Sequence, residues 1–355
     1  MSSASAAGAS ADAPVQVLED FAGLVQLLSD GTVTRRSDAN GLPVPSFPPT
    51  LSAEWKDVVY SPNHGLKLRI YKPAAASSAA AAPNVEGDDA PTKLPVLVYF
   101  HGGGFCVGSF DHPNFHACCL RLAAELPALV VSAGYRLAPE NRLPAAHDDA
   151  RTLVSWLRAK AAGAPAGSSS DPWLAERADS GRVFFAGDSA GGNIAHHVAV
   201  ALGSGLLGVT PARVAGYVLL WPFFAGVERT RSEAESPPGP FVSLPVYDQF
   251  CRLSLPAGAT RDHPALNPFG PESPALDAVA LPPVLVVVGE HDLLRDRAAG
   301  YVARLEALGK PVELVEFQGQ HHGFFPVEPW GDAGGELIRV VRRCRCPDPG
   351  APDPN

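Results

Sequence analysis

No run of apolar residues in this chain is long enough to cross a bilayer. Positive charge is also scarce: 28 Lys and Arg residues stand against 37 Asp and Glu residues, which gives a formal net charge of −9. Nucleic acids and anionic membranes bind basic surfaces, so neither is expected as a general partner. With 46% hydrophobic and 18% charged residues, the composition is that of an ordinary globular protein.

Cysteine is rare and follows no framework pattern. The six cysteines stand at positions 106, 118, 119, 251, 344 and 346. The adjacent Cys118 and Cys119 fall on a predicted helix, which suits a reducing compartment better than a set of disulfide bonds. Cys344 and Cys346 are too few to hold a metal, so no metal site is expected. The cytoplasm is the expected location, with the nucleus as the alternative.

The two ends of the chain are predicted to be disordered. Residues 1–14 are almost entirely Ala, Ser and Gly, without the apolar segment of a secretory signal or the arginines of a transit peptide. Residues 346–355 form the second predicted tail. The length between them, 15–345, allows one large domain with a substantial core.

The first part of this domain is predicted to contain a helix, a strand and a loop. Residues 15–28 carry apolar side chains at helical spacing, which predicts an amphipathic helix. Leu66, Leu68 and Ile70 alternate with polar side chains and predict a half-buried strand. Residues 74–92, rich in Ala, Ser and Pro, predict a mobile surface loop.

After this loop, short apolar runs alternate with helical stretches. The predicted strands are 96–100, 128–132, 182–186, 214–220, 284–288 and 312–317. The predicted helices are 116–125, 146–160, 191–203, 296–308 and 335–345. Continuously apolar strands separated by helices indicate an α/β fold with a mostly parallel sheet covered on both faces. Residues 228–268 break this rhythm and indicate an insertion above the sheet.

The strongest motif is Gly187-Asp188-Ser189-Ala190-Gly191, a G-x-S-x-G sequence. A buried strand is predicted before it and a helix after it, which is the context that makes the motif informative. The turn between strand and helix must be sharp to project the serine, and the two glycines leave room where side chains would collide. The helix N-terminus adds positive potential where negative charge would develop.

His101 and a run of three glycines, Gly102, Gly103 and Gly104, directly follow the predicted strand 96–100. It does not fit a phosphate loop, because no Gly-Lys-Ser/Thr ending follows. It fits an oxyanion loop, formed by the N–H groups of this glycine run together with that of Ala190. His101 is interpreted as a structural anchor of the loop rather than as a base.

An acid and a histidine complete the pattern. Asp292 follows a buried strand and is preferred to Asp296, which comes a helical turn later. His322 follows the last strand and is preferred to His321, because it directly precedes a Gly-Phe pair. Serine, then aspartate, then histidine is the chain order of the α/β-hydrolase triad.

The chain resembles the hormone-sensitive-lipase branch of the α/β-hydrolases, through residues 101–104 and 187–193. Residues 135–140, 261–264 and 267–268 resemble the plant carboxylesterases of that branch more narrowly. The resemblance implies an α/β-hydrolase fold with a helical cap over the site. Its cap pieces would be residues of about 15–50 and 228–268.

The resemblance also implies an activity, the hydrolysis of small-molecule carboxylic esters without a cofactor. Residues 104–109 and 114–120 are similar to a plant subgroup that includes strigolactone-hydrolysing enzymes, which suggests strigolactone hormones or related lactones as substrates. Five residues are candidates for a substrate pocket, although each could equally be core: Phe105, Val107, Phe241, Tyr247 and Phe324. A homodimer is left open.

Two alternatives come from the same resemblance. The gibberellin receptors share the scaffold but lack the catalytic histidine, and here His322 stands in the matching place. Plant isoflavanone dehydratases carry a threonine where Ser189 stands. Both residues therefore favour an esterase over a hormone receptor or a dehydratase.

Overall fold

The computed structural model describes residues 14–36, 44–45, 47, 53–74, 93–162, 171–237 and 239–345. The predicted tails, apart from Pro14, and the predicted loop after Ala74 lie outside these residues. The chain divides into two compact units, Met1–Ala39 and Asn40–Asn355.

The smaller unit contains a three-stranded antiparallel sheet, so the helix predicted for residues 15–28 is wrong. Its strands are β1 (Val17–Phe21), β2 (Val25–Leu28) and β3 (Val33–Arg35). A tight turn joins β1 to β2, with positive φ at both Ala22 and Gly23. The Asp20 carboxylate accepts the Gly23 N–H at 2.7 Å and fixes this turn. An Asp-Phe-Ala-Gly turn therefore outweighs the helical spacing of the apolar residues.

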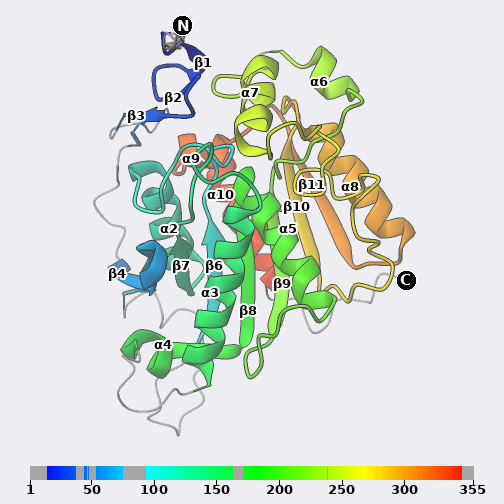
Figure 1. Cartoon of the computed structure of the whole chain (residues 1–355). Helices are drawn as coiled ribbons and strands as arrows, with labels where there is room; N and C mark the ends of the chain where they lie inside the picture. Colours follow the sequence, from blue (N-terminus) through cyan, green and yellow to red (C-terminus); the bar gives the residue numbers. More distant parts are fainter. Residues whose placement is uncertain are drawn as a thin grey trace, which may run out of the picture. The chain divides into compact units, whose positions relative to one another are not determined.

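The larger unit is built on an eight-stranded sheet in the order β11-β10-β9-β8-β6-β7-β5-β4 (Figure 1). Its strands are β4 (Ala53–Ser61), β5 (Leu66–Pro73), β6 (Leu94–Phe100), β7 (Leu129–Ala133), β8 (Ala178–Asp188), β9 (Val214–Leu220), β10 (Val284–Gly289) and β11 (Val312–Phe317). The strands from β7 to β11 run parallel, and β5 and β4 add an antiparallel edge. The six apolar runs found in the sequence are all strands of this sheet. Strand β4 was not predicted.

Helices cover both faces of the sheet, which accounts for the apolar strands. The helices α2 (Pro113–Glu125) and α10 (Asp332–Arg345) pack on one face, over one continuous apolar cluster. On the other face lie α3 (Ala145–Ala161), α5 (Ala190–Gly203) and α8 (Arg295–Ala307), with α3 and α5 in front of the strands in Figure 1. Two shorter helices, α4 (Pro172–Arg177) and α9 (Phe324–Val327), and the turn η1 (Pro62–His64) complete this framework.

The insertion predicted at residues 228–268 is present as α6 (Arg231–Glu235), α7 (Leu244–Ser254) and loops, without a strand among its described residues. The C-terminal carbonyls of α7 are held by Arg142, whose guanidinium donates to the carbonyl oxygens of residues 252, 253 and 255 at 2.6–2.8 Å. A cation at the last carbonyls of a helix stabilises the helix end. This segment, called the cap segment below, is thus tied to the core.

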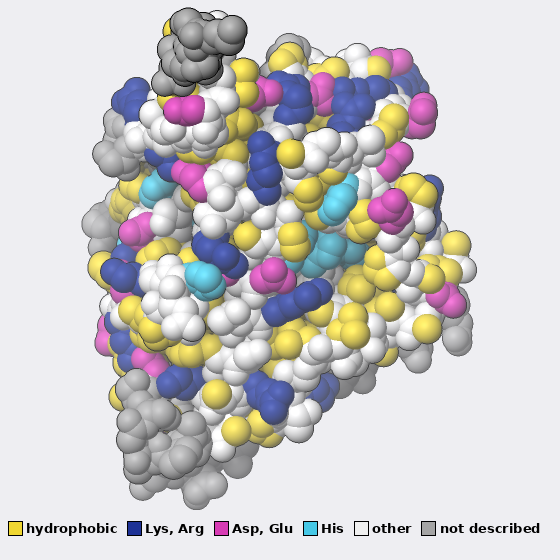
Figure 2. Space-filling view, viewed as in Figure 1, with side chains coloured by type: hydrophobic (Ala, Val, Ile, Leu, Met, Phe, Trp, Pro, Cys, Tyr) yellow, Lys and Arg dark blue, Asp and Glu magenta, His cyan; other side chains and the backbone are white. Residues whose placement is uncertain are grey.

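The surface matches the composition. Figure 2 shows acidic and basic side chains interspersed over the visible face, without a broad patch of either sign there. In the part of the chain that the structure describes, none of the helices is long and apolar enough to cross a membrane.

Helix α5 packs so closely on the sheet that one glycine is indispensable. A Cβ on Gly191 would lie 1.9 Å from the carbonyl oxygen of Phe100, whereas a Cβ on Gly300 in α8 would meet nothing within 4 Å. Gly191→Ala is expected to lower the free energy of unfolding by about 3 kcal/mol or more. Gly300→Ala is the matched control and is expected to raise it by up to about 1 kcal/mol. Urea unfolding of both variants measures this; equal stabilities would contradict the close packing.

Candidate active site

Ser189 lies in a strained turn at the carboxyl end of β8. It has φ 53° and ψ −113°, a conformation that side chains other than glycine rarely adopt. Its amide donates to the Leu220 carbonyl at 2.9 Å, and its own carbonyl accepts the Phe223 N–H at 2.8 Å. Bonds to the end of β9 and to the segment after it hold the turn, and strain stored at one residue is typical of functional sites.

The glycines on either side of the serine allow this turn to form. A Cβ on Gly187 would lie 2.3 Å from the backbone of Gly191, and one on Gly192 would lie 3.1 Å from Pro222. The backbone thus turns within a space that only glycine leaves free. Ser189 is the N-cap position of α5, and the amide of Ala190 begins that helix.

His322 lies within hydrogen-bonding distance of both Ser189 and Asp292. The His322 Nε2 atom is 2.9 Å from Ser189 Oγ, and its Nδ1 atom is 3.0 and 2.9 Å from the two Asp292 carboxylate oxygens. An ionised carboxylate can only accept, so Nδ1 carries the proton and Nε2 is free to accept the serine O–H. Asp292 is fully buried, and the other two side chains are 7% exposed.

The two rejected neighbours are placed elsewhere. Asp296 lies in the first turn of α8, where its carboxylate accepts the backbone N–H of Ser232 at 2.8 Å. His321 packs against the ring of His291, with centroids 5.3 Å apart. The structure therefore brings Asp292 and His322 to the serine, as the sequence predicted, and leaves Asp296 and His321 out of this contact.

The three-glycine loop follows β6 and has the backbone of a tight turn. Gly103 has φ 113° and Gly104 has φ 58°. The Gly103 carbonyl accepts the N–H groups of Cys106 and Val107 at 2.9 and 3.0 Å, which turns this carbonyl back into the loop. A Cβ on Gly103 would lie 2.1 Å from the Val107 carbonyl oxygen, so only glycine fits.

His101 anchors this loop through its contacts with Tyr135. Its ring stacks on Tyr135 at 4.3 Å, and the Tyr135 hydroxyl donates to the His101 carbonyl at 2.8 Å. Burial lowers the pKa of His101 to about 4, so the ring is neutral at neutral pH. These contacts fit the structural role expected from the sequence.

Asp188 connects the loop to the nucleophile turn. It is 3% exposed; its Oδ1 accepts the Tyr99 hydroxyl at 2.7 Å, and the Gly102 backbone also hydrogen-bonds its carboxylate. The Gly102 amide, one of the predicted oxyanion donors, is therefore engaged by Asp188, so of the predicted loop donors Gly103 and Gly104 remain. Burial raises the pKa of Asp188 to about 6, against the opposing effects of these hydrogen bonds and of His322.

Two of the predicted pocket residues, Phe105 and Tyr247, lie in an aromatic cluster. Phe105 is 1% exposed and meets Phe223 edge-on with centroids 5.9 Å apart. Tyr247 contacts the same ring at 5.2 Å, and its hydroxyl donates to the Phe224 carbonyl at 3.0 Å. Since the Phe223 N–H donates to the Ser189 carbonyl, the cluster supports the nucleophile turn from behind. Both residues have core surroundings, the alternative that the sequence left open.

The other three differ in exposure. Phe324 packs on Trp221 at 4.8 Å, and the Trp221 ring lies 6.5 Å from that of His322, so Phe324 belongs to the wall behind the histidine. Val107 is 7% exposed, and Phe241 is half-buried in the segment before α7.

Phe250 of α7 lies on the glycine loop and was missed in the sequence. A Cβ on Gly104 would meet its ring at 2.4 Å, so the aromatic ring covers the loop directly. Phe250 is 5% exposed and also contacts Phe223 at 6.5 Å. The apolar spacing within α7 indicates a buried face, but nothing local to that helix tells which loop the face covers.

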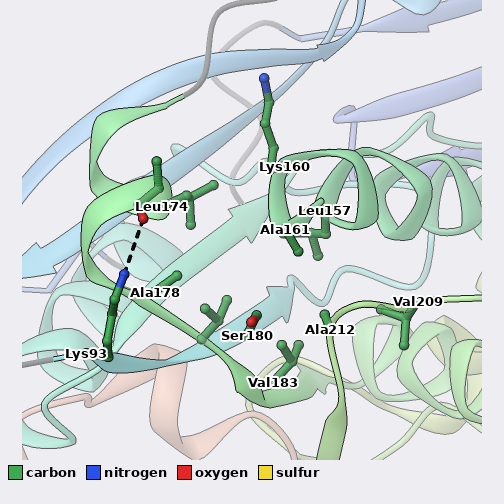
Figure 3. A pocket seen from close by; sticks show the side chains of 12 residues that line it. Lys93, Leu157, Lys160, Ala161, Leu174, Ala178, Ser180, Val183, Val209 and Ala212 are labelled. Carbon is green, nitrogen blue, oxygen red and sulfur yellow. Dashed lines mark hydrogen bonds between the residues drawn. The ribbon is translucent and has the colours of Figure 1, made fainter. Parts of the chain in front are cut away.

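A separate pocket of about 300 Å³ lies at the opposite end of the sheet (Figure 3). Its lining includes Ala178 at the start of β8, Val183 at its middle, and two lysines, Lys93 and Lys160. Val183 precedes Ser189 by six residues, which at about 3.3 Å per strand residue places it roughly 20 Å away. This pocket therefore has no part in the site at Ser189.

Asp188 should be needed for its shape more than for its charge. Asp188→Ala removes both acceptors and frees the glycine loop, so any turnover at Ser189 is expected to fall on the order of 100-fold. Asp188→Asn can keep both bonds, because the Tyr99 hydroxyl can accept as well as donate. Because the folded-state pKa is raised above 3.8, burying the charge costs stability as the pH rises from about 4 to about 6. Urea unfolding should therefore show Asp188→Asn gaining on the wild type across that range; a constant difference would contradict the raised pKa.

Comparison with known proteins agrees with this geometry. The family described as alpha/beta hydrolase fold matches residues 97–326, and the carboxylesterase family matches residues 47–140. The 3-O-acetylpapaveroxine carboxylesterase CXE1 of Papaver somniferum is 36% identical over 84% of this chain and 89% of that protein. Gibberellin receptor GID1C of Arabidopsis thaliana is 37% identical over 76% and 74%, respectively.

Solved structures show the same architecture. An esterase of Pyrobaculum calidifontis superposes with a TM-score of 0.64 at 29% identity, covering 82% of this chain and 84% of that one. The sheet order, the Ser189 turn and these similarities lead to one assignment. The chain belongs to the α/β-hydrolase family and is of the carboxylesterase type.

Proposed function

We propose that this protein hydrolyses carboxylic esters through an acyl-enzyme, with Ser189 as nucleophile, His322 as general base and acid, and Asp292 as its orienting carboxylate. The observation that carries the proposal is the continuous hydrogen-bonded chain from Ser189 Oγ through the imidazole to Asp292. It lies beside a glycine loop with two residues in the left-handed region.

The reaction runs in two halves. His322 Nε2 takes the proton of the Ser189 hydroxyl as Oγ attacks the ester carbonyl carbon, and then gives it to the departing alcohol. A water molecule, deprotonated by the same nitrogen, attacks the acyl-enzyme and releases the carboxylic acid, while Oγ regains its proton. Asp292 keeps Nδ1 protonated throughout and stabilises the imidazolium. No step requires a metal or an organic cofactor.

The negative charge on the carbonyl oxygen would be stabilised by the amides of Gly103, Gly104 and Ala190. The positive end of α5 points toward the same place. Because the site is largely buried, these dipoles act in a medium of low polarity and need little reorganisation. The Gly102 amide would act indirectly, by fixing the loop through Asp188.

A hormone receptor with little turnover is the second candidate, because the identity to gibberellin receptor GID1C is 37%. The receptors resemble this chain but lack the catalytic histidine, whereas here His322 stands 2.9 Å from the serine. A dehydratase is disfavoured by the serine at position 189. The geometry therefore favours hydrolysis over both.

For substrates, we propose small hydrophobic esters or lactones, with strigolactones among them. The support is the similarity of residues 104–109 and 114–120 to the strigolactone-hydrolysing subgroup, together with the apolar cover that Phe250 places on the glycine loop. Such a cover favours an apolar group beside the reacting carbonyl.

Ser189→Ala is expected to lower kcat on short p-nitrophenyl esters by about four to six orders of magnitude, because both halves of the reaction pass through Oγ. The release of p-nitrophenol measures it. His197→Ala is a suitable control, since that half-buried side chain on α5 contacts His147 and the Ala265 carbonyl rather than the triad. Equal, slow rates for wild type and Ser189→Ala would overturn the proposed function and favour the receptor.

The substrate class is tested separately, with a strigolactone and a p-nitrophenyl ester of similar size as competitors. If the lactone is a substrate, chromatography should detect its hydrolysis products with the wild type and not with Ser189→Ala. Binding without products would restrict the lactone to a ligand. If neither binding nor products are detected, strigolactones are excluded as substrates, and the proposed esterase activity is unaffected.

A further inference from the structure

The acid of the triad lies on a short turn between β10 and α8. The Asp292 N–H donates to the Gly289 carbonyl at 3.1 Å, and the carboxylate accepts the Leu294 N–H at 2.8 Å. Helix α8 begins directly afterwards, at Arg295. The position of the carboxylate therefore depends on how the first turn of α8 is held.

Helix α8 has no cap of its own. Its N-cap residue is Leu294, whose apolar side chain cannot accept a hydrogen bond from the free N–H groups of the first turn. The Arg295 N–H donates to the Asp292 carbonyl at 3.0 Å, and the N–H of the next residue needs a further acceptor.

Ser232 of α6 provides it from 64 residues away. The Asp296 N–H donates to the Ser232 hydroxyl oxygen at 3.2 Å, and the hydroxyl donates to the Leu293 carbonyl at 2.7 Å. The Ser232 N–H donates in turn to the Asp296 carboxylate at 2.8 Å. Three hydrogen bonds thus join one 2% exposed serine of the cap segment to the residue after Asp292 and to the start of α8.

The short helix α6 is itself held firmly in place. A capping box between Thr230 and Glu233 closes its first turn. The Glu233 carboxylate, completely buried, forms an ion pair with Arg297 of α8 at 2.7 Å. Arg297 also donates to the carbonyl of Gly226, at 3.2 Å, and to that of Glu228. The cap segment therefore presents Ser232 in one fixed geometry.

We propose that Ser232 is a positioning residue for the triad: its hydroxyl caps α8 in place of Leu294 and thereby sets the orientation of Asp292 toward His322. The cap segment then helps to position a catalytic residue in addition to covering the substrate site. The proposal rests on the esterase function proposed above and predicts that a change in the cap segment alters the chemical step.

Ser232→Ala is expected to lower kcat on p-nitrophenyl acetate about tenfold, with KM nearly unchanged, because small displacements of a catalytic group are costly and this small ester needs little of the cap segment. The proton NMR signal of the His322 Nδ1–H, far downfield because of the Asp292 hydrogen bond, is expected to shift or broaden. Ser232→Thr keeps the hydroxyl and should restore both readouts in large part.

Ser254→Ala is the matched control. Ser254 is also a fully buried serine of the cap segment, but its hydroxyl has no hydrogen-bond partner among the described residues. Its loss should change neither kcat nor the downfield signal. If Ser232→Ala does not fold, Asp296→Ala loosens the same junction from its half-exposed side and should change both readouts in the same direction.

An unchanged kcat and an unchanged downfield signal in Ser232→Ala would overturn the proposal. So would a loss that Ser254→Ala reproduces, or one confined to KM, because either would indicate an effect of the cap segment on packing or on substrate binding alone. If the wild type shows no Ser189-dependent turnover, the esterase proposal fails first, and the NMR signal still reports whether Ser232 sets the Asp292–His322 contact.

Discussion

The contact between helix α5 and the end of strand β6 is the constraint on which the site depends. Only the hydrogens of Gly191 separate the helix from the Phe100 carbonyl, and Gly187 meets the same helix turn from the β8 side. This close approach forces the chain to reverse direction within one residue, so Ser189 takes the strain at φ 53°. The serine then stands between the carboxyl end of β8 and the first residue of α5, Ala190.

Two buried carboxylates, those of Asp292 and Asp188, connect the Ser189 turn to the rest of the site through different hydrogen bonds. Asp292 is tied to His322 and to the N–H of Leu294, so its charge faces donors on both sides. Asp188 instead holds the glycine loop to the nucleophile turn, and its pKa is raised to about 6 because its two donors compensate burial only in part. One carboxylate is hydrogen-bonded to the His322 imidazole, and the other joins the glycine loop to the Ser189 turn.

Much of this could be predicted from the sequence, because the information is local. Apolar residues mark each strand of the parallel part of the sheet, and Ser189, Asp292 and His322 follow the strands β8, β10 and β11 within five residues. The failures occur where the deciding contact is distant or conformational. Residues 15–28 form two strands instead of the expected helix, because a turn separates them in which the Asp20 carboxylate accepts the Gly23 N–H. Phe250 and Ser232 carry no motif; their roles depend on which loop or helix end lies opposite them.

The cap segment shows why those distant contacts bear on function. Phe250 rests on Gly104 of the glycine loop, while Ser232 of the same segment hydrogen-bonds the start of the helix that follows Asp292. Free variation of the cap segment would disturb both of these contacts. Arg142 and the Glu233–Arg297 pair limit that freedom by fixing the two ends of the segment to the core. The cap segment is therefore least constrained between these anchors, near Phe241, which lies between α6 and α7.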